Sequence, residues 1–168
     1  MNKPSVQFAT RTMATHGEHK PMRVVLHDTE SHDHAGIGDI KGIFDFWKRQ
    51  GLGYGAHLVI DKSGNTGQGC MFKSIAWHVE GHNTGSIGIE QSGFARFTPK
   101  AWYLRRRQLR KVAEWLAYLS QSAGIPLVHS MAHGVCTHAD FHGGHTDPGS
   151  GYPLKHVLRM ARRIKARG

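Results

Sequence analysis

The sequence has no apolar run of about 18 residues or more. Its first twenty residues also lack the apolar block of about 7–15 residues that marks a secretory signal peptide. We therefore expect neither an ordinary membrane-spanning helix nor a secretory signal sequence. Cysteine is scarce too, since only Cys70 and Cys136 are present. Two distant cysteines make neither a disulfide framework nor a CxxC metal motif, so we expect both to be reduced and buried.

Acidic residues are few, with 12 Asp and Glu against 22 Lys and Arg, which gives a net charge of +10. This balance favours a polyanionic partner: nucleic acid, an anionic membrane surface or an anionic cell-wall polymer. The net charge alone does not indicate which of these three partners the protein binds. The length of 168 residues suits one domain with a single buried core. We expect a monomer.

Short apolar segments alternate with amphipathic segments along the chain. We predict strands at 22–30, 85–93 and 125–130, a hairpin at 56–69, and helices at 39–51, 98–124 and 153–168. Asp39 and Thr98 are expected to cap the first two helices. This order predicts an α/β fold, a single domain with a central mixed β-sheet flanked by helices. Residues 1–20 are expected to be an N-terminal extension or a short pairing strand, and residues 21–168 the single folded domain.

The stretch "THADFHGGHTDPGSGYP" (137–153) concentrates metal-capable side chains among glycines and prolines. A catalytic zinc site takes three protein ligands and leaves a position for water. His138 and Asp147 can supply two of them, because a glycine-rich loop can bring its ends together. The third ligand should stand on a rigid element. His27 is the best candidate, since it ends the predicted strand "RVVLH" and strand ends in α/β folds open onto the ligand crevice.

A histidine after a strand is more often a hydrogen-bonded residue than a ligand. In a chain with 14 histidines, clusters also arise by chance. The residues alone therefore leave open whether the loop binds a metal.

The motifs "VVLHDTE", "GAHLVIDKSG", "AWHVEGHNTGSIGIEQSG" and "THADFHGGHTDPG" occur in the order found in type-2 zinc N-acetylmuramoyl-L-alanine amidases. The resemblance extends from Met22 to Arg163. This class also includes peptidoglycan recognition proteins, and the basic, compact chain is most similar to phage endolysin domains. The resemblance implies cleavage of the bond between N-acetylmuramic acid and L-alanine of peptidoglycan. It also implies synthesis in a host cytoplasm and action on the bacterial cell wall.

The resemblance makes His27, His138 and Asp147 the ligands of a Zn²⁺ ion. His142 and His133 are alternatives for the second ligand. They rank lower because "THAD" matches the pattern of the family, and because His142 stands only five residues before Asp147.

For catalysis, the resemblance implies Glu90 as the general base. Strand alternation places Glu90 on the face opposite its apolar neighbours. Ala56 stands where phage relatives often carry a catalytic tyrosine, and Tyr54 is out of register for that role. His145 stands where many relatives carry lysine, and we expect it to stabilise the oxyanion. Histidine changes charge near neutral pH, so this departure adds pH dependence.

Three residues of "AWHVEGHN", Trp77, His78 and Asn83, are expected to line the substrate groove. The basic helices are expected to attract anionic wall polymers or a membrane surface. One alternative is a peptidoglycan-binding module without activity, which would lack the ligand triad or the base. A metal-dependent nuclease is a weaker alternative, because the sequence has no clustered acidic pair. We therefore expect no nucleic-acid partner.

Overall fold

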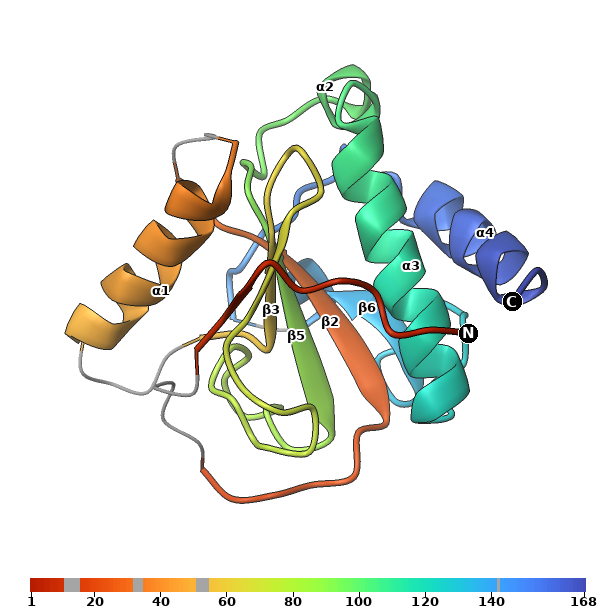
Figure 1. Ribbon diagram of the computed structural model, residues 1–168, viewed down its shortest axis with the longest axis horizontal. Coiled ribbons are helices and arrows are strands. Elements are labelled where there is room, and N and C mark those ends of the chain that lie inside the picture. The colour runs from red at the N-terminus through yellow and green to blue at the C-terminus, as the bar shows by residue number, and fades with distance from the viewer. Residues whose placement is uncertain (11–15, 32–34, 51–54, 142) are drawn as a thin grey trace.

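The computed structural model describes residues 1–168 except 11–15, 32–34, 51–54 and 142. A mixed sheet of six strands, in the order β1-β4-β3-β5-β2-β6, runs through the middle of the molecule (Figure 1). This confirms the predicted α/β class. The strands are β1 (Phe8–Ala9), β2 (Arg23–Asp28), β3 (Leu58–Ile60), β4 (Thr66–Gln68), β5 (Ser86–Gln91) and β6 (Gly134–Thr137). The helices are α1 (Ile37–Gln50), α2 (Pro99–Tyr103), α3 (Arg106–Ser122) and α4 (Leu154–Lys165), with a short 3-10 helix η1 (His138–Asp140).

Helices cover both faces of the sheet, with α1 on one side and α3 and α4 on the other (Figure 1). Strand β3 shows how the faces divide: Leu58 and Ile60 pack toward α3, whereas Val59 packs against α1. This division follows from the two-residue period of a strand. Because both faces are covered, the central strands β2 and β5 are buried along almost their whole length.

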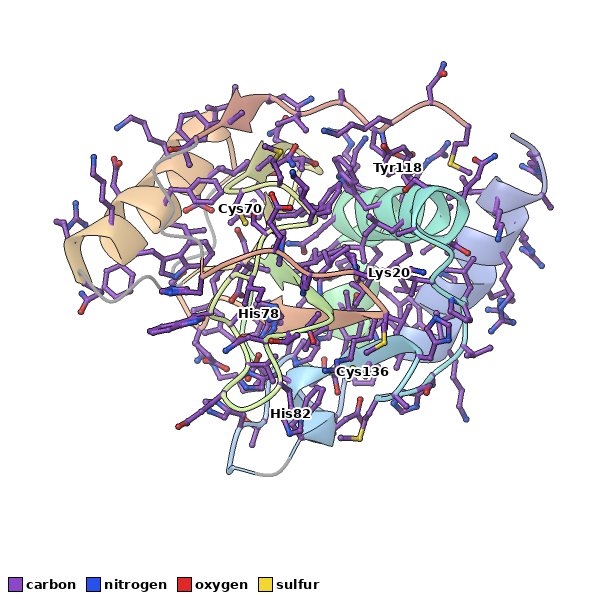
Figure 2. The ribbon with its side chains drawn as sticks, turned by 90° about the horizontal axis from the view of Figure 1, so that it is seen from below. Lys20, Cys70, His78, His82, Tyr118 and Cys136 are labelled. Atoms are coloured by element: carbon purple, nitrogen blue, oxygen red, sulfur yellow. The ribbon has the colours of Figure 1, made fainter. Side chains whose placement is uncertain are left out.

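The two cysteines are unpaired and buried, as predicted. Cys70 packs in the cluster under α1, and Cys136 packs against Val25 and Phe141. Figure 2 shows them in separate regions of the molecule. Burial raises the pKa of each thiol to about 12, so both stay protonated at neutral pH.

Strands β2, β5 and β6 are mutually parallel and adjacent, with β2 in the middle. Their carboxyl ends therefore meet at one edge of the sheet. The predicted hairpin is confirmed as the antiparallel pair β3–β4. Near the N-terminus, β1 pairs in parallel with β4 and extends the sheet. Within the described part of the chain, no helix has the length and apolar character needed to cross a membrane.

The helix predicted at 98–124 is two helices, because the chain leaves helical geometry at Arg105 (φ −95°, ψ 45°). The Arg105 side chain donates to the Ser92 carbonyl at 3.1 Å and lies over the Phe97 ring at 4.6 Å. These tertiary contacts accompany the bend. The predicted cap is confirmed at Thr98, whose hydroxyl accepts a hydrogen bond from the Ala101 amide.

Helix α1 begins at Ile37, two residues before the predicted start. The cap predicted at Asp39 is therefore wrong, since this residue lies in the first turn. Its carboxylate instead accepts a hydrogen bond from the Ser92 hydroxyl at 3.0 Å.

The strand predicted at 125–130 is also wrong, and β6 lies just after it. Pro126 has no amide proton for a ladder. The Leu127 carbonyl accepts from Arg162, and only His129 forms an isolated bridge, with Val135. The run "GVCT" supplies the strand instead. This shift matters for the site, because His138 directly follows β6.

Candidate metal centre

Three neighbouring strands bring Glu90, His27 and His138 together. His27 pairs with Glu90 across β2 and β5. On the other side, Leu26 pairs with Thr137 of β6, so His138 follows beside His27. Because Leu26 packs in the core under α3, strand alternation turns His27 to the opposite face. The site thus lies at the carboxyl edge of the sheet, on the face away from α3.

The glycine-rich loop then returns Asp147 to His138. The Ala139 amide donates to the Asp147 carbonyl at 2.9 Å and closes the loop. Gly149 has φ +87°, and a Cβ there would collide with the Ala95 carbonyl. Only glycine allows this close approach without strain. The missing side chain therefore lets the loop pack against residues 94–97 and hold Asp147 in place.

Asp140, another carboxylate of this loop, does not join the cluster. Its Oδ2 accepts hydrogen bonds from the Thr137 amide at 2.7 Å and from the Thr137 hydroxyl at 2.9 Å. It also contacts His129 Nε2 at 2.9 Å. Asp140 therefore holds the turn that starts η1.

Three side chains converge on one point. His27 Nδ1 lies 3.1 Å from His138 Nδ1 and 3.0 Å from Asp147 Oδ2, while His138 Nδ1 lies 3.0 Å from Asp147 Oδ1. Ligand atoms about 2.0–2.1 Å from a tetrahedral zinc stand roughly 3.3 Å apart. The observed separations are close to this spacing, and two imidazoles with one carboxylate are a donor set that suits zinc. These residues therefore fit a zinc ion.

The protonation states also suit a cation. Burial lowers the pKa of His27, which keeps the imidazole neutral. Burial acts to raise the pKa of Asp147, but hydrogen bonds from His138 and His27 outweigh it and lower this pKa. A neutral imidazole and an ionised carboxylate are the forms that bind a metal.

Glu90 lies beside His27 with Oε2 buried and without a hydrogen-bond partner among the described residues. Burial raises the pKa of this carboxyl well above its usual value, and the nearby Asp147 and Asp28 carboxylates add to the shift. A carboxylate of raised pKa can take up a proton near neutral pH.

A cleft of about 790 Å³ opens in front of this cluster. Glu90, Trp77 and His145 all line it. Trp77 is 42% exposed, and His16 stacks on its ring at 3.6 Å. The exposed His145 stacks on His138 at 3.9 Å and reaches within 4.0 Å of Asp147.

The other two predicted groove residues, His78 and Asn83, also line the cleft, but their polar atoms contact other groups of the protein. Asn83 Oδ1 accepts hydrogen bonds from the backbone amides of His78 and Val79, at 2.9 Å and 2.8 Å. Burial lowers the pKa of His78 well below its usual value, so this ring is neutral, and its Nδ1 lies 3.0 Å from His27 Nε2.

Sequence reasoning missed one wall of the cleft, formed by Phe46 and Trp47 of α1 and by Asp28 and Glu30 after β2. Phe46 is 51% exposed. Its position off the apolar stripe of α1 was the signal that could have identified it.

The alternatives considered for the site fall outside it. His133 is exposed and absent from the converging group. Ala56 is buried. His142 and Tyr54 lie outside the described residues.

The comparisons with known proteins agree with the fold. The endolysin N-acetylmuramoyl-L-alanine amidase LysCS from Clostridium intestinale is 18% identical, with a TM-score of 0.72 over 96% of this chain and 97% of that chain. The Staphylococcus aureus hydrolase AmiA, solved with its ligand, is 18% identical with a TM-score of 0.72, over 99% of this chain and 87% of that chain. Apis mellifera PGRP-SA is 16% identical with a TM-score of 0.70, over 91% and 94%. At these identities the likeness shows a shared fold.

No curated protein sequence matches the chain. The sequence profile described as N-acetylmuramoyl-L-alanine amidase matches residues 17–150, which is most of the chain. The chain therefore belongs to the N-acetylmuramoyl-L-alanine amidase family.

Proposed function

We propose that the chain is a zinc-dependent hydrolase that acts as a phage lysin. It cleaves the amide bond between the lactyl group of N-acetylmuramic acid and L-alanine in peptidoglycan. The observation that supports this is the convergence of His27, His138 and Asp147 at a cleft, with Glu90 beside them. A module that only binds peptidoglycan needs neither this donor set nor a buried base.

When bound by these residues, zinc lowers the pKa of a water to about 7 and polarises a carbonyl oxygen. Glu90 accepts the proton of the attacking water and passes it to the departing nitrogen. The water oxygen bonds to the lactyl carbon, and the carbon–nitrogen bond breaks. The products are a lactyl carboxylic acid and the free amino group of L-alanine.

His145 and Trp77 have supporting roles in this proposal. The exposed imidazole of His145 lies next to the ligand cluster and donates a hydrogen bond to the developing oxyanion. Trp77 has one face covered by His16 and lines the cleft with the rest of its ring, so it can stack on a sugar or a peptide. If His145 has this role, His145→Lys should alter the pH–rate profile, and an unchanged profile would exclude it.

The experiment that tests the function is digestion of purified peptidoglycan followed by mass spectrometry. We expect free lactyl-muramic ends and new L-alanine amino termini, formed with zinc and not with a chelator. Plasmid DNA in a parallel digestion should stay intact. Binding of peptidoglycan without new amino termini would instead indicate a recognition module.

The net charge is concentrated on one side of the molecule. Twelve of the 22 Lys and Arg, and only one of the 12 acidic residues, lie within residues 98–123 and 154–168, which leaves ten basic and eleven acidic residues elsewhere. These segments contain α3 and α4, which pack side by side (Figure 1).

We propose that this basic layer draws the enzyme to anionic wall polymers. Cosedimentation with isolated cell walls should weaken as salt screens the charges. Retention that is independent of salt would contradict the proposal, and preferential binding to anionic lipid vesicles would indicate a membrane surface instead.

A further inference from the structure

The ring of His78 contacts His27 on the side opposite the ligand cluster. His27 Nε2 lies 3.0 Å from His78 Nδ1, while His27 Nδ1 faces His138 and Asp147. We propose that His78 is a positioning residue, which orients the His27 imidazole and fixes its proton on Nε2. This inference rests on the proposed zinc site, and it replaces the groove role expected for His78 from the sequence.

A backbone carbonyl favours one position for the proton of His78. His78 Nε2 faces the carbonyl oxygen of Ser86 at 3.5 Å. A carbonyl oxygen can only accept, so this contact favours the tautomer of His78 in which Nε2 carries the hydrogen. A neutral imidazole has one N–H, and His78 Nδ1 is therefore an acceptor.

The same reasoning extends to His27. With His78 Nδ1 as the acceptor, His27 Nε2 donates to it across 3.0 Å. The neutral His27 ring then has a lone pair on Nδ1, which is the atom directed at His138 and Asp147. In the opposite tautomer His27 Nδ1 donates to Asp147 Oδ2 at 3.0 Å, while His78 donates from Nδ1 and leaves its bare Nε2 against the Ser86 carbonyl. A metal at the ligand cluster requires the first tautomer, because it binds the Nδ1 lone pair in place of that proton. The two contacts from Ser86 through His78 to His27 thus favour the tautomer whose Nδ1 lone pair can bind a metal.

The surroundings of His78 hold its ring in this orientation. A Cβ at Gly88 would lie only 2.7 Å from His78 Cγ, so the ring rests directly on β5. Asn83 holds the His78 amide through its side-chain oxygen. On another side lies the buried ring of His57, 5.8 Å away and perpendicular. Figure 2 labels His78 in the region of β2, the strand that carries His27.

The matched pair His78→Asn and His78→Leu tests the inference. The two side chains have nearly the same shape, but only asparagine offers an acceptor near the position of Nδ1. The readout is the zinc dissociation constant, measured without substrate by competition with a chromophoric chelator. We expect His78→Leu to weaken zinc binding by about 10–100-fold and His78→Asn to retain most of the affinity. Circular dichroism of the metal-free variants checks that both fold.

The alternative outcomes are distinguishable. If His78 contacts substrate instead, His78→Leu will raise KM at unchanged zinc affinity, and the inference is overturned. Equal weakening in both variants would also overturn it, because the acceptor would then be irrelevant. If the unmodified protein binds no zinc, the proposed function itself fails. An active, zinc-binding parent with an unaffected His78→Leu variant refutes only the role of His78.

Discussion

Glu90→Gln is expected to lower kcat by about 10²–10⁴-fold, the usual contribution of a general base. Glutamine keeps the shape of the side chain but cannot take a proton from water or deliver it to the leaving amine. The position of Glu90 beside His27, with one buried oxygen that has no partner among the described residues, makes it the best-placed carboxylate for this transfer. The measurement is the rate of amide cleavage of a soluble muropeptide by zinc-loaded protein.

Glu80→Gln is the matched control. Glu80 lines the same cleft but is exposed and belongs to the turn after Trp77. Its variant should keep kcat near that of the unmodified protein. A Glu90→Gln variant with normal kcat and normal zinc content would show that Glu90 is not the general base.

Removal of a ligand is expected to have a comparably large effect. His138→Ala and Asp147→Ala should each reduce bound zinc from about one ion per chain to a small fraction and abolish cleavage. The reason is that a catalytic zinc has only three protein ligands, so the loss of one leaves a site of two. Metal analysis after dialysis measures the first effect, and the muropeptide assay measures the second.

His133→Ala and His142→Ala separate this ligand set from the alternatives. Both variants should retain zinc and activity, since His133 is exposed outside the cluster and His142 ranks below His138 on the motif. Loss of zinc in either variant, together with retention in His138→Ala, would reassign the second ligand.

Local patterns indicated His27, His138 and Asp147 as candidates, and the resemblance to the amidase family was needed to choose them and to add Glu90. His27 ends an apolar strand, and Glu90 alternates with Ile87 and Ile89, so both positions follow from the two-residue period of strands. The convergence of His138 and Asp147 was predicted from the flexibility of a glycine-rich loop. The candidate positions need only residues near in sequence and the tendency of parallel strand ends to share an edge, whereas their roles came from the resemblance.

Features that depend on distant partners were not predictable in this way. The bend at Arg105 accompanies a contact with the Ser92 carbonyl. The pairing of His78 with His27 joins residues 51 positions apart, on a loop and a strand. Neither contact leaves a periodic signal in the sequence. The strand β6 was missed because the equally short apolar run before it was taken as the strand, although Pro126 has no amide proton for a ladder.

The buried imidazole of His57 also determines how the protein responds to acid. Burial lowers the pKa of His57 to about 4, while its hydrogen bond to the Ser74 carbonyl only partly opposes the shift. An unfolded chain has a histidine pKa of about 6.5, so between these values it binds a proton that the native state excludes. The free energy of unfolding then falls as pH drops through this window, by up to about 1.4 kcal/mol per pH unit for this residue. A fold with so many enclosed imidazoles is suited to neutral surroundings and poorly suited to an acidified compartment.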